Sequence, residues 1–280
     1  MLLELAIGDA YGAGFEYADA EMIHRRNDLS CYVQHPRHHI RPGSYTDDTQ
    51  MSLAIAEAIV AGEPWTPTML ARRFVEVFKR DPREGYATGF FHFLLNVRDD
   101  EQFLREINPT SDKSGAAMRA APIGIYPTLS LVIERCTMQA ALTHNTPDGI
   151  HAAVAAALMT HYFLYRLGPK KELGSFLEKQ VSGQWAAPWA GKVMSQGWMS
   201  VRAAVTALIR CHTMSQLLKT CIQFSGDVDT VAAIALAVGS CSSEIAQDIP
   251  VHLVDTLENG QYGRDYIQRL DTQLMAFMSG

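Results

Sequence analysis

The chain of 280 residues carries 24 basic and 30 acidic side chains, a formal net charge of −6, and 48% of its residues are hydrophobic. This balance excludes a disordered, collagen-like or coiled-coil protein, and the lack of a basic excess argues against nucleic-acid binding. The five cysteines are scattered and contain no C-x-x-C pair. They argue against a disulfide framework or a zinc site and favour a reducing, cytoplasmic setting.

Helical signals dominate the sequence in chain order. Apolar and small side chains recur with the spacing of amphipathic or fully buried helices, and segments rich in glycine and proline separate them. These patterns predict helices over residues 49–61, 68–79, 129–142, 149–167, 199–210, 215–223, 228–239 and 263–278. The one candidate strand covers residues 30–34, and no low-complexity linker divides the chain. We therefore expect an all-α fold in which residues 1–280 form a single compact domain.

The longest uncharged run covers residues 149–165, which is slightly short of a membrane span. It contains His151 and His161, so we predict a buried core helix there. The first residues also lack the basic segment of a secretory signal peptide. We therefore expect no membrane partner.

Two carboxylates and two hydroxyls stand side by side in residues 46–49, directly before an apolar helix. Asp47 or Asp48 is well placed to cap that helix and to interact favourably with its dipole. The same oxygen-rich group also suits divalent cations, because neighbouring side chains at a helix start diverge by roughly 100° and reach different ions. Taken alone, this segment leaves both interpretations open.

A second oxygen-rich segment contains Asp227, Asp229 and Thr230 and leads into another apolar, alanine-rich helix. It is not an EF-hand loop, because Ala232 occupies the position of the required glycine and no glutamate closes the loop. The D-x-D-T string also resembles the nucleophile motif of haloacid-dehalogenase phosphatases, but no buried strand precedes it here. Hard oxygen donors of this kind suit Mg²⁺, Mn²⁺ or Ca²⁺ better than zinc.

The two acidic segments are expected to lie together, because the helices that follow them are apolar enough to pack side by side. Four carboxylates in one low-dielectric site would repel one another unless cations neutralised them. Together the segments therefore predict a pair of divalent ions, an arrangement that orients a substrate and activates water.

Three further segments carry candidate functional residues. Glu16 follows a glycine-rich segment, residues 7–15, whose spacing is not that of a nucleotide-binding fingerprint and which suits close helix packing. Ser114 and Gly115 begin a segment that offers backbone N–H groups to an anion such as a phosphate. His144 lies between two apolar helices, where a hydrogen-bonded core histidine and a functional histidine are both open interpretations.

Residues 35–42 are rich in histidine. His38 and His39 lie between the prolines at residues 36 and 42, and His35 directly precedes the first proline. Such a loop is typical of the protein surface. We expect these histidines to be solvated and not to form a metal site.

Taken in order, these segments resemble the ADP-ribosylglycohydrolase family, which includes the dinitrogenase reductase-activating glycohydrolases. The resemblance covers roughly residues 7–240, and its motifs are residues 8–16, 42–49, 115–122, 143–144 and 226–233. No single motif is decisive, but the ordered set is specific. The resemblance implies a helical bundle of the ADP-ribosylglycohydrolase type with a centre of two Mg²⁺ or Mn²⁺ ions.

The resemblance also implies a role for each matching residue. The metal ligands would be Thr46, Asp47, Asp48, Asp227, Asp229 and Thr230. The substrate-binding residues would be Glu16, Ser114, Gly115, Met118, His144, Asn145, Ser225 and Gly226. Glu16 or Asp48 would act as the catalytic acid or base, and Glu16 is favoured because the other acids would be committed to the metals.

The implied activity is hydrolysis of the bond between ADP-ribose and an acceptor side chain, with arginine as the favoured acceptor. An ADP-ribosylated protein would then be the partner and ADP-ribose the product. A serine linkage and O-acetyl-ADP-ribose remain alternative substrates, and a non-catalytic ADP-ribose binder, a toxin-immunity protein and a metal-dependent phosphohydrolase remain alternative functions. Ser225 stands where the family commonly has glycine, a departure that bears on substrate preference more than on activity.

Overall fold

The structure is a computed structural model that describes residues 1–279. Within this range the chain forms α-helices and three short 3₁₀-helices, with isolated β-bridges and no β-strand. The α-helices are α1 (Leu2–Ala13), α2 (Ala20–Arg26), α3 (Asp47–Val60), α4 (Pro67–Arg80), α5 (Thr88–Asn96), α6 (Asp100–Glu106), α7 (Gly115–Met118), α8 (Leu129–Ala141), α9 (Pro147–Leu164), α10 (Leu173–Gln180), α11 (Gly197–Arg210), α12 (Met214–Gln223), α13 (Val228–Gly239), α14 (Val251–Thr256) and α15 (Arg264–Ala276). The 3₁₀-helices are Ala121–Ile125, Lys170–Glu172 and Phe277–Ser279. The all-α prediction is confirmed.

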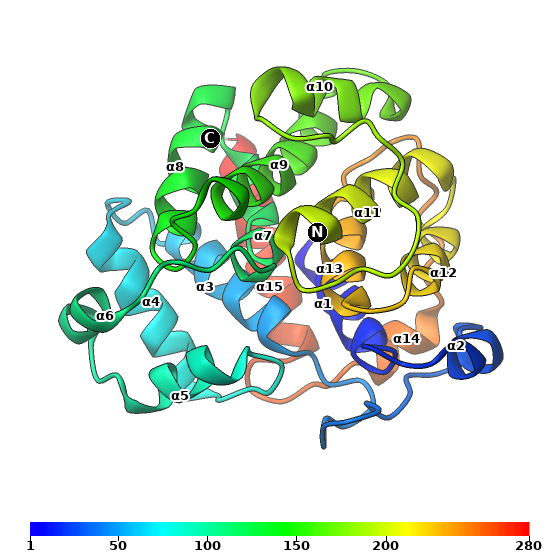
Figure 1. Cartoon of the computed structure of the whole chain (residues 1–280), viewed down its shortest axis with the longest axis horizontal. Helices are drawn as coiled ribbons and strands as arrows, with labels where there is room; N and C mark the ends of the chain where they lie inside the picture. Colours follow the sequence, from blue (N-terminus) through cyan, green and yellow to red (C-terminus); the bar gives the residue numbers. More distant parts are fainter. Residues whose placement is uncertain (280) are drawn as a thin grey trace.

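The pairing of α1 with α13 forms the centre of the bundle, and the other helices surround it (Figure 1). The two helices run antiparallel, because Gly8 lies against Ala232 while Gly12, one turn later, lies against Asp229. A Cβ added at either glycine would come within 2.5 Å of the backbone of α13. Glycine is required at both positions because any side chain would push the two backbones apart.

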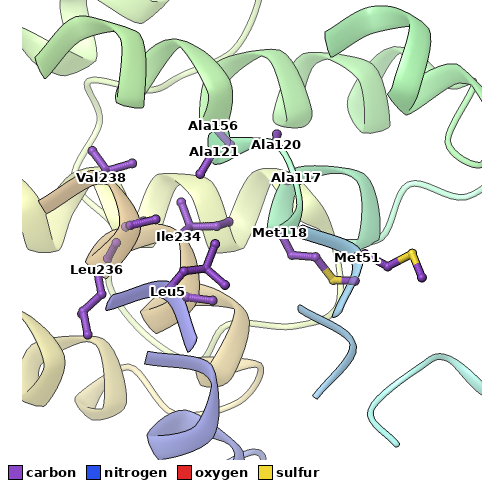
Figure 2. Packing of buried hydrophobic residues seen from close by; sticks show 14 of the residues in the cluster. Leu5, Met51, Ala117, Met118, Ala120, Ala121, Ala156, Ile234, Leu236 and Val238 are labelled. Carbon is purple, nitrogen blue, oxygen red and sulfur yellow. The ribbon is translucent and has the colours of Figure 1, made fainter. Parts of the chain in front are cut away.

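Small residues also dominate the neighbouring layers of the core. Figure 2 shows Ala117, Ala120, Ala121 and Ala156 facing Ile234 on α13, so that α7, the following 3₁₀-helix and α9 all approach the central pair. Every residue of α13 is buried, which explains its continuous apolar sequence. The helix predicted over 149–165 is likewise the buried α9. No helix within residues 1–279 combines the length and the apolarity needed to cross a bilayer.

All eight predicted helices are present, with their ends shifted by a few residues. The helix predicted to continue to residue 167 stops at Leu164, and Arg166 has a left-handed φ of 52°. The strand predicted over 30–34 is wrong: its Tyr32 and Val33 are buried, but the segment pairs with no strand among the described residues. The sequence did not predict α1, α2, α5, α6, α7, α10 or α14, which are short or, in α1, interrupted by glycine.

The close contact between α1 and α13 gives a first testable prediction. A Cβ at residue 8 would lie 2.5 Å from the carbonyl oxygen of Ala232, and backbone atoms cannot rotate away. We therefore expect Gly8→Ala to lower the free energy of unfolding by about 2 kcal/mol. The control is Gly89→Ala in α5, where nothing lies within 4 Å and alanine favours the helix by up to ~1 kcal/mol. Denaturant unfolding measures both, and equal stabilities would contradict the packing described.

Candidate active site

A cavity of about 480 Å³ opens where the end of α1 meets the starts of α3, α7 and α13, a volume typical of small-molecule sites. Helix α5 and the segment that leads into it, the end of α6 and the connection from α6 to α7, the connection between α8 and α9, and the segment before α11 complete its wall. The residues around it are Glu16, Tyr17, Asp47, Asp48, Gly85, Tyr86, Ala87, Gly89, Phe90, Phe93, Glu106, Ile107, Asn108, Ser111, Lys113, Ser114, Gly115, Met118, Arg119, Thr143, His144, Ser195, Asp227, Asp229 and Thr230. The two acidic segments of the sequence, 46–49 and 227–230, therefore meet at one cavity.

Five of the six carboxylates on this cavity form what we call the carboxylate cluster: Glu16, Asp47, Asp48, Asp227 and Asp229. Oxygens of Glu16, Asp227 and Asp229 all lie within 4.8 Å of one another, close enough to share one metal ion. Asp47 and Asp48 come from the first turn of α3 on the neighbouring part of the wall. All four aspartates are buried, and Glu16 is half-buried.

Burial and mutual repulsion disfavour the ionised form of these groups. Burial raises the pKa values of Asp47, Asp48 and Asp229 well above their usual range, and neighbouring carboxylates raise them further. Burial and the charge of Glu16 raise the pKa of Asp227 to about 6, despite the lowering effect of its hydrogen bonds. Anionic oxygens held this close need a compensating positive charge.

Two oxygens of the cluster, Oδ1 of Asp48 and Oδ1 of Asp229, are buried and have no hydrogen-bond partner among residues 1–279. Buried polar atoms are rarely left unpaired, and an unpaired one points to a water or an ion. Carboxylate and hydroxyl oxygens are the ligands that hard divalent cations prefer. The residues present therefore fit divalent metal ions.

Asp9, which the sequence analysis did not single out, fixes the start of α3. Its buried carboxylate accepts hydrogen bonds from the backbone N–H and the hydroxyl of Thr46 (2.9 and 2.7 Å) and from the same two groups of Thr49 (3.0 and 2.6 Å). Thr46 is the N-cap residue, and Asp47 and Asp48 lie inside the first turn, so the prediction that one of them caps the helix is wrong. Since α1 supplies this cap, both aspartate side chains remain available to the cavity.

A tight turn before α13 places Asp227 beside the end of α1. Ser225 and Gly226 both have left-handed φ values, 60° and 91°, and a Cβ at residue 226 would lie 1.8 Å from the carbonyl oxygen of Val193. The turn is held by Val193, which bonds to both sides of it, and by Tyr17, whose N–H donates to the Gly226 carbonyl at 2.8 Å. The conformation of Ser225 explains why glycine is suited to that position. Neither Ser225 nor Gly226 lies on the cavity wall; both shape the backbone behind it.

Glu16 is held by His35, which is buried, so the prediction that this histidine is solvated is wrong. Nδ1 of His35 accepts the backbone N–H groups of Arg37 and His38, each at 3.0 Å. Its proton is therefore on Nε2, which donates to Oε2 of Glu16 at 2.8 Å. His38 and His39 are exposed, as expected.

The other expected substrate-binding residues fall into two groups. Ser114, Gly115, Met118 and His144 lie on the cavity wall. Asn145 is exposed and lies outside the wall, with its backbone N–H donating to the Pro109 carbonyl. Among the expected metal ligands, Thr230 is on the wall, whereas Thr46 lies behind it.

The wall also contains residues that the sequence did not single out. Tyr86, Phe90 and Phe93 add an aromatic surface to the cavity. Arg119 and Thr143 also reach the cavity. Phe90 and Phe93 share one face of α5. The hydrophobic pattern of this short helix does not show whether that face lines a cavity or packs in the core.

Fold and site together define an all-α protein with a buried polycarboxylate cavity. The sequence model of the ADP-ribosylglycohydrolase family matches residues 1–279, so the chain belongs to that family and is a hydrolase of the ADP-ribosylglycohydrolase class. It is 25% identical to the ADP-ribosylhydrolase ARH3 of Xenopus tropicalis, over 96% of this chain and 93% of that protein. It is 24% identical to the ADP-ribosylarginine hydrolase Tri1 of Pseudomonas putida, over 84% of this chain and 67% of that protein.

A solved structure described as an ADP-ribosylglycohydrolase-related protein complex has the same fold. It superposes with a TM-score of 0.75 at 20% sequence identity, covering 99% of this chain and 96% of that chain. The arrangement of helices is therefore retained although most residues differ.

The raised pKa of Asp227 gives a pH-dependent prediction. A carboxyl whose pKa is raised by folding binds its proton more tightly in the folded state, so this group stabilises less as pH rises from about 4 through about 6. In metal-free protein we expect Asp227→Asn to raise the free energy of unfolding at pH 7.5 by about 1–3 kcal/mol and to change little at pH 4.

Denaturant unfolding in EDTA, with and without excess Mg²⁺ or Mn²⁺, measures this effect. Either ion should stabilise the wild type and stabilise Asp227→Asn much less. Asp255→Asn, at an exposed position of α14, is the matched control and should behave as the wild type. If Asp227→Asn destabilises the metal-free protein at pH 7.5, the carboxylates do not repel as described.

The cap that Asp9 provides gives a separate prediction. Asp9→Asn keeps the shape of the side chain but replaces one acceptor oxygen with an NH₂ donor, which then faces either the Thr46 hydroxyl or the N–H and hydroxyl donors that Oδ2 accepts. We expect a loss of about 2–3 kcal/mol in the free energy of unfolding. Asp28→Asn, an exposed carboxylate that accepts one hydrogen bond from the Ser30 N–H, should cost less than about 0.5 kcal/mol. Similar losses for both variants would refute the special role of Asp9.

Proposed function

We propose that this protein uses divalent metal ions to hydrolyse the bond between ADP-ribose and a modified side chain of a protein, with arginine as the acceptor. Family membership gives the reaction class. The observation that carries the metal dependence is the carboxylate cluster, in which two buried oxygens have no partner. An ADP-ribosylated protein is the proposed substrate and free ADP-ribose the product. The proposal treats residues 1–280 as a single domain, which the one continuous hydrophobic core of the described residues supports.

The proposed cofactor is a pair of Mg²⁺ or Mn²⁺ ions. When bound, such ions hold vicinal sugar hydroxyls and lower the pKa of a coordinated water. The proposed ligands are Thr46, Asp47, Asp48, Asp227, Asp229 and Thr230. Thr46 donates its hydroxyl proton to Asp9, which leaves the oxygen lone pairs of Thr46 free for a cation.

Glu16 is the proposed proton acceptor for the attacking water, with Asp48 as the alternative. The His35 N–H fixes the carboxylate of Glu16 by binding Oε2, and the guanidinium of Arg37 lies 3.5 Å from Oε1. Both contacts come from the loop between α2 and α3, so this loop orients Glu16. A fixed carboxylate at the edge of the cavity is suited to take a proton without leaving its position.

The remainder of the cavity is proposed to hold the ADP-ribosyl group. Ser114, Gly115, Met118 and His144 line the same cavity as the acids. Asn145, Ser225 and Gly226 complete the proposed substrate-binding set, the last two through the backbone turn that positions Asp227. The aromatic side formed by Tyr86, Phe90 and Phe93 offers stacking surface for a planar group.

Arginine is proposed as the acceptor because the similarity to ADP-ribosylarginine hydrolase Tri1 extends over 84% of this chain. The match to the ADP-ribosylhydrolase ARH3 covers more of this chain, 96%, and the name of that protein specifies no acceptor. Serine-linked ADP-ribose and O-acetyl-ADP-ribose are therefore kept as competing substrates. A guanidinium is a poor leaving group and needs a proton as the glycosidic bond breaks. The three substrates therefore differ in how much the leaving group needs a proton from the site.

The test compares ADP-ribosyl-arginine, ADP-ribosyl-serine and O-acetyl-ADP-ribose, each with Mg²⁺, Mn²⁺ or EDTA, and detects free ADP-ribose and free phosphate separately. We expect release of ADP-ribose from the arginine conjugate, supported by either metal and abolished by EDTA. Asp47→Ala and Asp229→Ala should each lower turnover by about 10³-fold or more, because each removes a proposed ligand. Asp255→Ala, an exposed residue of α14, is the control and should retain full activity.

Each alternative has a distinct outcome. Full activity of Asp47→Ala in Mg²⁺ would refute the metal centre, and release of phosphate would identify a phosphohydrolase. Faster cleavage of the serine conjugate than of the arginine conjugate would identify serine, and not arginine, as the acceptor. Tight binding of ADP-ribose without turnover of any substrate would identify a binder or an immunity protein.

A further inference from the structure

Arg119 is a fully buried arginine that has no carboxylate partner among residues 1–279. Its Nε donates to Oε1 of Gln139 at 2.6 Å, and its Nη2 donates to the Gln139 carbonyl at 3.1 Å. The ring of Phe74 lies 4.4 Å from its guanidinium carbon. A buried charge without a counter-ion is costly, so the site retains it at the expense of stability. A further hydrogen bond of Nη2, to Thr143, indicates the role of this arginine.

Nη2 of Arg119 also donates to the hydroxyl oxygen of Thr143 at 2.8 Å. A guanidinium has only donors, so the oxygen of Thr143 must be the acceptor and its own proton must go elsewhere. The neighbouring acceptor is Nδ1 of His144, 2.7 Å from the same oxygen. If Nδ1 carried a proton instead, the buried Thr143 hydroxyl would face two donors and its own proton would have no acceptor.

His144 lines the cavity, and of its two ring nitrogens only Nδ1 has a hydrogen-bond partner among the described residues, which leaves Nε2 available to a ligand. A Cβ added at Gly115 would be 3.0 Å from Cε1 and 3.3 Å from Nε2 of His144. The absence of a side chain at Gly115 therefore gives space to this edge of the imidazole ring. Burial and the nearby charge of Arg119 lower the pKa of His144 to about 3. The ring is therefore neutral at physiological pH, with a single proton.

We propose that Arg119 is a positioning residue which, through the Thr143 hydroxyl, fixes His144 as the Nε2–H tautomer so that this N–H donates to an oxygen of the bound ligand. The identity of that ligand as an ADP-ribosyl group rests on the function proposed above. The tautomer itself depends only on the three side chains. His144 is thus a fixed hydrogen-bond donor and does not transfer protons during the reaction.

The first test reads the tautomer directly in ligand-free, metal-free protein. Long-range ¹H–¹⁵N correlation spectra distinguish the protonated from the unprotonated ring nitrogen, and His144→Gln identifies the resonances among the ten histidines. We expect the wild type and Thr143→Ser to carry the proton on Nε2. Thr143→Val, which has nearly the same shape but no hydroxyl, should show a mixture or the Nδ1–H form. A proton on Nδ1 in the wild type would overturn the proposal, and this result needs no variant to fold.

The second test measures the affinity of Mg²⁺-loaded protein for ADP-ribose by calorimetry. Loss of the oriented donor should weaken binding by about tenfold in Thr143→Val, and Thr143→Ser should bind within about twofold of the wild type. Equal affinity of the valine variant and the wild type would overturn the donor role. Wild-type protein that binds no ADP-ribose would refute the proposed function instead, while the tautomer measurement would still decide whether the Thr143 hydroxyl, which accepts from Arg119, orients the ring.

Discussion

The contact between α1 and α13 is the constraint on which the site depends. Because Gly8 and Gly12 let the two backbones touch, the end of α1 and the start of α13 lie at the same place, and Glu16 comes within metal-sharing distance of Asp227 and Asp229. The same helix carries Asp9, which caps α3 from the side. Helix α1 thereby contacts both acidic segments. If the backbones of α1 and α13 moved apart at the two glycines, Glu16 would move away from Asp227 and Asp229.

The site is costly to the fold in the absence of a ligand. Buried carboxylates that repel one another, and a buried arginine without a counter-ion among residues 1–279, both oppose folding. Such groups are retained where binding or chemistry needs them. The two kinds of charge serve one cavity in different ways: the acids suit cations, and Arg119 acts through Thr143 on a donor for an oxygen of the ligand.

Much of the fold could be predicted because long apolar helices have a clear periodicity. Helices α3, α9 and α13 are buried almost throughout, and their sequences are correspondingly apolar. Helix α1 escaped prediction because its glycines lower local helix propensity, and its stability comes from packing against α13. His35 was misassigned for a similar reason: a histidine in a proline-bounded loop is typical of the surface, and only the fold brings Glu16 to its ring.

The sequence by itself determined the helical class, the family and the residue types at the site, because motifs and hydrophobic periodicity are local properties of the chain. It also indicated that residues 46–49 and 227–230 belong together, from their shared oxygen chemistry. Only the tertiary structure decided that Asp9 and not Asp47 or Asp48 caps α3, that His35 orients Glu16, and that Arg119 reaches His144 through Thr143. These are contacts between side chains far apart in sequence or on different elements, and they follow from how closely the helices pack, which no local pattern encodes.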